Sequence, residues 1–466
     1  MIAQLDTKSV YTFMESLVTI KDYVQVAKSM GYDALGIMDV DNLYGAYEFI
    51  ETCQAQKLSP LVGLEIGLEV DNETIPFRMM ALSTKGYQNL MKMSTVKMMG
   101  KSNWEDVKHL TEGVAVIVPA PFASGDLPLG LDYFIGVFAD TPVQEFSHPV
   151  LPLHTVRFFE AGDVEAMQML AAIKDNQSLT ETGPIDSTTV LKTPQDLKND
   201  FAERFPQAIT NLENLVQGIQ YDIDTQLKLP RFNPQKPAVE ELRELAQAGL
   251  LRKNLTSPVY QERLEHELDI IHQMGFDDYF LIVWDLLRFG RSQGYYMGMG
   301  RGSAVGSLVA YSLGITGIDP VEKNLLFERF LNVERYTMPD IDIDIPDIYR
   351  PEFIRYVRDR YGSYHAAQIV TFSTFGAKQA IRDVFKRFGV PEYELTSITK
   401  RIGFRDTLTT AYEQNLAFRQ VIHSRAEFER GFEIAKRIEG QPRQTSIHAA
   451  GVVMSDQDLT DHIPLK

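Results

Sequence analysis

One short segment alternates acidic and aliphatic residues with the period of a β-strand. Asp340, Asp342 and Asp344 are separated by single isoleucines within 338–346. Successive strand side chains point to opposite faces, so the carboxylates would share one face, about 6.5–7 Å apart. Carboxylates this close repel one another unless a cation lies between them. Oxygen ligands favour Mg²⁺, and two such ions can clamp an in-line phosphoryl transfer. The segment therefore predicts a magnesium-binding strand.

The segment has two other interpretations. An EF-hand loop also begins with alternating aspartates, but it needs Gly at loop position 6 and Glu at position 12. Ile345 and Pro351 stand there instead, which excludes that site. A solvated acidic strand with one buried face stays open as the alternative.

A glycine-rich loop precedes the aspartates by about 40 residues. The run Gly298-Met-Gly-Arg-Gly-Ser303 predicts a loop that feeds a helix, with Ser303 near the N-cap. Backbone N–H groups at Gly302 and Ser303 would favour a phosphate, and Arg301 would add charge. The loop lacks the lysine of a Walker A motif, so a tight turn before a capped helix is the alternative. Together, loop and aspartates favour a metal-dependent nucleotidyl transferase.

A third motif favours a polyanionic substrate. Lys378, Arg382 and Lys386 recur every four residues opposite an apolar face, which predicts a helix with a basic stripe. The chain has a net charge of −17, yet residues 372–443 hold 13 Lys and Arg against 9 Asp and Glu. We expect phosphate contacts there, with a solvated charged face as the alternative.

The N-terminal part alternates helical and strand patterns up to about residue 200, which predicts an α/β barrel or layered sheet. A helix start at 193–196 and a three-proline connector at 229–237 place a first boundary near 195. No stretch approaches the roughly 18 apolar residues of a membrane span, so we expect a cytoplasmic protein without membrane contact. The single cysteine, Cys53, excludes an internal disulfide and a cysteine zinc site.

The glycine loop, the aspartate segment and several further motifs, in this order along the chain, resemble the palm of bacterial DNA polymerase III alpha subunits. These are the C-family replicative polymerases, and the resemblance is to those of a Gram-positive lineage. The motifs that carry the resemblance are 275–284, Gly300–Ser303 with 306–311, 327–332, 338–344, 369–372, 380–383 and 448–453.

The resemblance implies a fold and a domain order. The fold class is a multidomain α/β protein with an N-terminal PHP-type α/β barrel, followed by a polymerase-beta-like nucleotidyltransferase palm with an inserted α-helical thumb. The implied domains are the PHP domain at 1–195, the first part of the palm with N-terminal helices at 196–371, the thumb at 372–441 and a truncated second part of the palm at 442–466.

The resemblance also implies roles for individual residues. Asp340 and Asp342 would be catalytic and hold two Mg²⁺ ions, with Asp344 a weaker candidate. Arg301, Gly302, Ser303, Lys378 and Arg382 would bind the nucleotide and its phosphates, and Lys386 and Arg443 would bind DNA. His448 matches a family position to which we assign no role.

The N-terminal part resembles the PHP domain of the same family, without its metal ligands. Metal-binding versions carry His-x-His, Asp-His and Asp-x-His, where this chain has Gln4-Leu-Asp6, Asp39-Val40 and Thr155-Val-Arg157. Asp39 and Glu65 alone are too few for a polynuclear site, since neutral imidazole is the usual ligand. We expect a structural PHP domain with no metal and no nuclease activity.

The implied function is template-directed DNA synthesis by two-metal transfer of a deoxynucleotide to a primer 3′-hydroxyl. Expected partners are primer–template DNA, deoxynucleoside triphosphates and other replisome subunits, with the sliding-clamp site beyond this chain. The family's third catalytic aspartate lies past residue 466, so we expect this fragment to be inactive alone. The alternatives are a PHP-type metallophosphoesterase and a non-catalytic DNA-binding or assembly module.

Overall fold

The computed structural model describes residues 3–123, 125, 127–226, 228–334 and 338–466. It divides into two compact units. Unit 1 comprises residues 1–224, 370–449 and 460–466, and unit 2 comprises residues 225–369 and 450–459. No helix among the described residues has the length and apolarity needed to cross a membrane.

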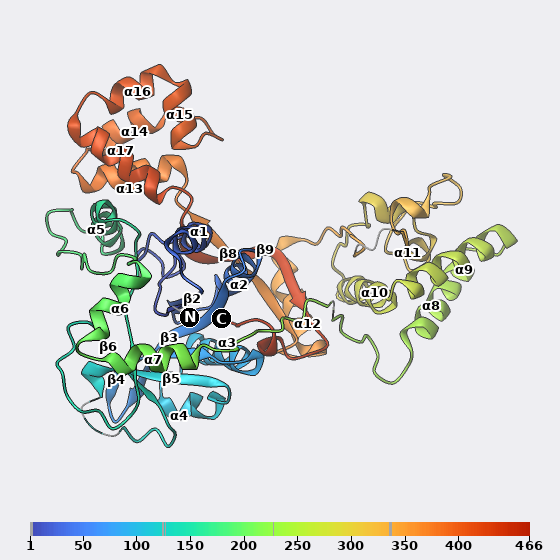
Figure 1. Cartoon of the computed structure of the whole chain (residues 1–466). Helices are drawn as coiled ribbons and strands as arrows, with labels where there is room; N and C mark the ends of the chain where they lie inside the picture. The colour runs from blue at the N-terminus through green and yellow to red at the C-terminus, as the bar shows by residue number, and fades with distance from the viewer. Residues whose placement is uncertain (1–2, 124, 126, 227, 335–337) are drawn as a thin grey trace. The chain divides into compact units, whose positions relative to one another are not determined.

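Unit 1 is built on a seven-stranded sheet whose strands follow one another in chain order. Figure 1 labels β2 to β6 of this sheet. The strands are β1 (Ala3–Gln4), β2 (Ala34–Val40), β3 (Ser59–Val70), β4 (Glu73–Ala81), β5 (Val114–Pro119), β6 (Phe134–Val137) and β7 (Val150–Pro152). β4 runs antiparallel to both neighbours, and the other pairs are parallel. The βα alternation predicted for the first 200 residues is confirmed in outline.

The sheet curls, so that segments following its first and last strands meet. Thr7 and Val156 form a parallel bridge, and the amide of Lys8 donates to the carbonyl of Val156 (2.9 Å). The result is a curled half-barrel and not a regular α/β barrel, because β3 and β4 are joined by a two-residue turn and no helix lies between them. Asp71 and Asn72 both adopt positive φ in that turn, as a tight hairpin requires.

Helices cover this sheet. They are α1 (Ile20–Met30), α2 (Ala46–Ala55), α3 (Thr84–Met98), α4 (Trp104–Val107), α6 (Pro194–Ala202) and α7 (Pro206–Leu215), with 3-10 turns η1 (Lys108–Leu110), η2 (Ala120–Phe122) and η3 (Ala161–Asp163). Thr193 caps α6 by accepting from the amide of Asp196, as its sequence predicts. Residues of α6 and α7 belong to the same hydrophobic core as the sheet. Unit 1 therefore continues past residue 195, where the sequence suggested a boundary.

A second core in unit 1 joins α5 (Val164–Lys174) to a later group of helices. These are α13 (Ala377–Arg387), α14 (Glu392–Thr399), α15 (Leu408–Gln414), α16 (Leu416–Ile422) and α17 (Ala426–Ile438). In the sequence they lie between β8 (Ala366–Thr374) and β9 (Pro442–Met454), which pair as a two-stranded sheet. Phe385 of α13 stacks on Phe428 of α17 within this core. The five helices are thus an insertion between two paired strands.

Unit 2 is mostly helical. Its helices are α8 (Ala238–Arg252), α9 (Pro258–Gln273), α10 (Asp277–Ser292), α11 (Leu308–Ser312) and α12 (Arg350–Tyr361), with 3-10 turns η4 (Gly302–Gly306), η5 (Phe327–Arg329) and η6 (Asp347–Tyr349). One hydrophobic core joins them. A further 3-10 turn, η7 (Leu459–Asp461), lies near the end of the chain. The three-proline connector at 229–237 precedes α8, as predicted.

Candidate functional site

The glycine loop and the aspartate segment lie side by side in unit 2. The amide of Gly298 donates to the carbonyl of Asp344 (3.0 Å), and the amide of Arg301 donates to the carbonyl of Asp342 (3.2 Å). Arg301 and Asp342 also form an isolated antiparallel bridge. The fold therefore brings together the two motifs that sequence analysis paired.

Two glycines allow this close approach. A Cβ on Gly298 would lie 2.8 Å from the Cβ of Asp344, closer than two side chains can come. Gly302 has φ +74°, a conformation that glycine adopts without steric cost. The glycine spacing thus serves the packing of the loop against the aspartates.

The prediction of a strand over 338–346 is wrong in one respect. Within the described part of the chain, the segment belongs to no sheet ladder, and its β pairing is the one bridge at Asp342. Pro339 and Pro346 lie on either side of residues 340–345, and a proline has no amide hydrogen with which to extend a ladder. The residues predicted to form a strand of a sheet therefore form an extended segment that pairs with the glycine loop.

The alternation of faces is confirmed for residues 340–344 and ends at Ile345, which is exposed. Ile341 and Ile343 pack against the core of unit 2, whereas Asp340 and Asp344 are exposed. Tyr279 of α10 hydrogen-bonds the backbone of Ile341, and burial raises the pKa of its hydroxyl above the usual value. The isoleucines and Tyr279 together fix the face on which the carboxylates stand.

Arg301 lies between two of the carboxylates. Its Nη1 is 3.1 Å from Asp342 Oδ2, and its Nε is 3.5 Å from Asp344 Oδ2. The three side chains are 61%, 41% and 68% exposed, and exposed ion pairs of this kind are weak. Arg301 can therefore exchange a carboxylate for a phosphate at small energetic cost.

Ser303 does not cap a helix. It lies within η4, and the N-cap of α11 is Ser307, whose Oγ accepts from the amide of Ala310 (3.1 Å). The sequence placed the cap too early because a 3-10 turn intervenes between the loop and the helix.

A buried carboxylate that the sequence did not predict lies behind this turn. Glu267 of α9 is fully buried, and its Oε2 accepts from Ser307 Oγ (2.9 Å) and the amide of Val309 (3.0 Å). Burial raises the pKa of Glu267, while hydrogen bonds from the backbone of Leu308 and Val309 and the contacts of Arg263 oppose the shift. The available signal was a charged pair spaced by four residues beside the apolar Leu264 and Leu268.

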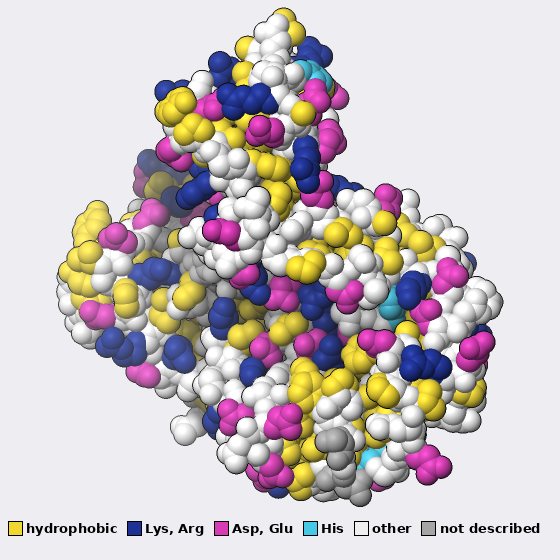
Figure 2. Space-filling model, turned by 90° about the vertical axis from the view of Figure 1, so that its left-hand side faces the viewer, with side chains coloured by type: hydrophobic (Ala, Val, Ile, Leu, Met, Phe, Trp, Pro, Cys, Tyr) yellow, Lys and Arg dark blue, Asp and Glu magenta, His cyan; other side chains and the backbone are white. Residues whose placement is uncertain are grey.

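The other predicted basic residues lie in unit 1. Lys378 and Lys386 of α13 are exposed on one face, as predicted, while Arg382 between them is paired with Glu392. Figure 2 shows Lys and Arg side chains interspersed with Asp and Glu on the face that it presents. The stripe is therefore confirmed as a helix face, and its role stays a prediction.

Arg443, predicted to bind DNA, has contacts within unit 1. Its Nη1 lies 3.2 Å from Oδ2 of the buried Asp383, and its guanidinium lies over the ring of Phe375 at 5.3 Å. These contacts attach β9 to α13 and give Arg443 a structural task.

The strand ends of the half-barrel hold a buried charged cluster. It includes Asp6 and Glu65, two positions compared above with the ligands of metal-binding versions of the domain. Lys8 is fully buried, and its Nζ lies 2.6 Å from Asp6 Oδ1, 2.7 Å from Glu65 Oε2 and 2.6 Å from the carbonyl of Met38. Arg78 Nη2 lies 3.0 Å from the same Glu65 oxygen. Sequence analysis missed both cations, because they become partners of the carboxylates only in the folded sheet.

The pKa values follow these contacts. Burial alone would raise the pKa of Asp6, but the charges of Lys8 and Arg78 hold it well below its usual range. Burial raises the pKa of Asp39, which accepts hydrogen bonds from the amide and hydroxyl of Ser9 and from the Thr12 hydroxyl, all at 2.7 Å. The cluster supplies internal partners for Asp6 and Asp39.

The remaining positions matched to metal ligands also bond internally. Gln4 Nε2 donates to the carbonyl of His154 (2.6 Å), and Thr155 Oγ1 donates to Asp6 Oδ2 (2.7 Å). Arg157 pairs with Glu15 at 3.1 Å. Across the described residues, no group of three or more His, Cys, Asp or Glu side chains is arranged to hold a metal ion.

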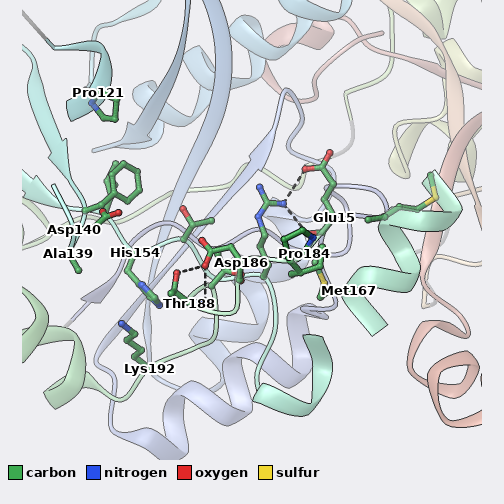
Figure 3. A pocket seen from close by; sticks show the side chains of 18 of the residues that line it. Glu15, Pro121, Ala139, Asp140, His154, Met167, Pro184, Asp186, Thr188 and Lys192 are labelled. Atoms are coloured by element: carbon green, nitrogen blue, oxygen red, sulfur yellow. Dashed lines mark hydrogen bonds and ion pairs between the residues drawn. The ribbon is translucent and has the colours of Figure 1, made fainter. Parts of the chain in front are cut away.

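A pocket in unit 1 adjoins these residues (Figure 3). Glu15, His154, Asp186 and Lys192 line it. Asp186 accepts from the Thr188 hydroxyl at 2.6 Å, and Lys192 pairs with Asp200 at 2.6 Å. Burial lowers the pKa of His154, so this side chain is neutral near pH 7. Most of the charged side chains that line the pocket are therefore already paired within unit 1.

Comparison with protein families gives two matches. The model of the bacterial DNA polymerase III alpha NTPase domain matches residues 238–466, and the model of the PHP domain matches residues 4–135. The first match contains the glycine loop and the aspartates, and the second contains Asp6, Lys8, Asp39, Glu65 and Arg78.

Individual relatives agree with these matches. The chain is 60% identical over its whole length to the DNA polymerase III subunit alpha of Streptococcus pyogenes and 35% identical, over 99% of its length, to that of Bacillus subtilis. It covers 45% of each, so it spans a little under half the length of these relatives. A solved structure from Bifidobacterium adolescentis, named as a metal-dependent phosphoesterase, is 12% identical and covers 33% of this chain and 86% of its own. Its TM-score of 0.25 is too low to support an argument.

Proposed function

Because the chain belongs to the family of bacterial DNA polymerase III alpha subunits, we propose that unit 2 carries metal- and triphosphate-binding residues of a template-directed DNA polymerase. The substrates are deoxynucleoside triphosphates and primer–template DNA. The observation that carries the proposal is the pairing of the glycine loop with the aspartate segment, which puts backbone N–H groups and Arg301 beside Asp342.

In this proposal Asp340 and Asp342 hold Mg²⁺, with Asp344 at the edge of the site. Two exposed carboxylates suit a magnesium site that completes its coordination with water and phosphate oxygens. A bound metal would offset negative charge on the phosphates and favour loss of the proton from the attacking hydroxyl. Arg301, Gly302 and Ser303 orient the triphosphate by hydrogen bonds, so the protein's own share of catalysis is positioning and charge neutralisation.

We assign the helices α13–α17 to the thumb and the residues on either side of them to the palm. Lys378, Arg382 and Lys386 line one face of α13 and are proposed to contact phosphates, with Lys378 and Lys386 the exposed members. Arg443 stays a proposed DNA contact, and its ion pair with Asp383 supports a structural task as well. Replisome subunits are further proposed partners of the whole protein.

The PHP half-barrel is proposed to be a structural domain without a metal. Lys8 and Arg78 already supply positive charge to Asp6 and Glu65, so a divalent ion would meet two fixed cations there. This arrangement disfavours a PHP-type metallophosphoesterase, the alternative function from another enzyme class. A non-catalytic DNA-binding module, the other alternative, differs from a polymerase in triphosphate binding, because such a module has no need of a triphosphate site.

The test is Mg²⁺-dependent binding of a deoxynucleoside triphosphate, measured by calorimetry on the chain as it stands. Asp340→Asn combined with Asp342→Asn should abolish the binding that depends on magnesium. The matched control is Asp269→Asn combined with Asp359→Asn, which removes two exposed carboxylates elsewhere in unit 2. Equal binding by the first double variant and the wild type would refute the assignment of the aspartates.

A further inference from the structure

An ion pair on helix α9 faces the turn that follows the glycine loop. Arg263 and Glu267 are one helical turn apart, with Arg263 Nε 2.6 Å from Glu267 Oε1. Glu267 is fully buried, and a buried carboxylate is destabilising unless its oxygens are matched by charge and hydrogen bonds. The ion-pair and hydrogen-bond partners of Glu267 therefore indicate its structural role.

The two side chains hold two consecutive residues of the turn. Arg263 Nη2 donates to the carbonyl of Gly306 (3.0 Å), and Glu267 Oε2 accepts from the hydroxyl of Ser307 (2.9 Å). Arg263 Nη2 also lies 3.1 Å from the carbonyl of Leu325, which it can bond as well. These contacts fix the point at which η4 ends and α11 begins, and they tie that point to the 325–327 segment.

The same contacts restrict where an anion can bind. The carboxylate of Glu267 accepts a hydrogen bond from the amide of Val309 at the N-terminus of α11. A negative charge therefore already occupies that end of the helix. The first amides of η4, at Gly302 and Ser303, have no partner within their own turn. These amides lie on the Asp342 side of the turn, where Gly302 approaches the Asp342 carboxylate.

We propose that the Arg263–Glu267 pair positions the triphosphate loop and directs the triphosphate to the η4 turn, away from the N-terminus of α11. The proposal rests on the proposed function of unit 2 and adds two positioning residues to it. Neither residue touches the substrate. They act through Gly306 and Ser307, whose placement sets the distance between the loop amides and the aspartates.

A stabilising role and a positioning role can be separated. Replacing a buried ion pair by apolar residues of similar volume is often neutral for stability. Arg263→Met combined with Glu267→Met should therefore preserve folding, while it removes the donor to Gly306 and the acceptor for Ser307. The matched control is Arg243→Met combined with Glu265→Met, a more exposed pair that also involves α9.

The experiment measures magnesium-dependent triphosphate affinity, thermal unfolding and amide hydrogen exchange over residues 302–310. The Arg263/Glu267 double variant should unfold near the wild-type temperature, bind about tenfold more weakly or worse, and exchange faster at 302–310. The control should match the wild type in all three. Should the double variant fail to fold, Glu267→Gln, which keeps the side-chain shape, is measured in its place.

The outcomes distinguish the two proposals. If the wild type does not bind triphosphate, the proposed function fails, and this inference fails with it. If the wild type binds and the Arg263/Glu267 variant binds equally well, the positioning role alone is overturned. An affinity loss that merely follows the unfolded fraction, with unchanged exchange at 302–310, also overturns it.

Discussion

Lys8→Met tests whether the half-barrel depends on its internal cation. Methionine has nearly the length of the lysine stem, so the substitution removes charge and leaves little cavity. The ammonium has three partners within 2.7 Å, from Asp6, Glu65 and Met38. Removing one member of a buried ion pair costs about 3–5 kcal/mol, because the partner charge stays buried. We expect a loss of that size in the free energy of unfolding at pH 7.

The assay is urea unfolding followed by tryptophan fluorescence. The chain has two tryptophans. Trp104 is buried in unit 1 and stacks on Phe77, so in a Trp284→Phe background the signal reports unit 1. Lys21→Met, which removes an exposed lysine of α1, is the control and should change the free energy by less than about 0.5 kcal/mol.

The pH dependence gives a second, signed expectation. In the wild type the pKa of Asp6 is depressed, so its contribution is complete above the unfolded pKa of about 3.9 and is lost only as the pH falls through the lower folded value. In Lys8→Met we expect the pKa of Asp6 to be higher than in the wild type, because one of the two cations that lower it is gone, so that acid neutralises the carboxyl at a higher pH. The difference in free energy of unfolding between the wild type and Lys8→Met should be largest near pH 7 and become smaller toward pH 4. A gap below about 0.5 kcal/mol at pH 7, or one that widens in acid, would refute the reasoning.

Two further expectations concern cations and DNA. In Lys8→Ala the space left beside Asp6 should accept a divalent ion. Millimolar Mn²⁺ should therefore raise the midpoint of thermal unfolding of this variant and leave that of the wild type unchanged. Equal responses of both proteins to Mn²⁺ would contradict this expectation. Lys378→Gln combined with Lys386→Gln should weaken DNA binding and lower the slope of log affinity against log salt by about one per lysine, as measured by fluorescence anisotropy. Lys21→Gln combined with Lys85→Gln, on the half-barrel, is the control, and an equal slope for both double variants would argue against phosphate contact at α13.

Local patterns in the sequence predicted local structure well. The apolar runs of unit 1 became β2 to β7, and the Thr193 cap began α6 as expected. The adjacency of the glycine loop and the aspartates was also predicted, because both motifs imply one chemistry and the glycine spacing allows backbones to approach.

Contacts between distant segments could not be predicted in the same way. Lys8 and Arg78 reach the same carboxylates only because the sheet curls, and Glu267 meets Ser307, 40 positions away, only after α9 and α11 have packed. Ser303 was placed at a cap because a 3-10 turn and the first turn of a helix have similar sequence signals. The aspartate segment looked like a ladder strand because its side chains alternate, although alternation does not reveal the number of strand neighbours.

The core that α5 shares with α13 and α17 bears on how this chain can be divided into pieces. The family matches leave residues 136–237 between them, which makes this interval look like a place to cut. A piece ending at residue 224 would keep α5 and lose the helices that cover it, so the apolar side chains of Met169, Leu170 and Ile173 would face water. Exposed apolar surface of this kind favours aggregation. Helix α5 and the inserted helices thus share one core, although residues 175–376 separate them in the sequence.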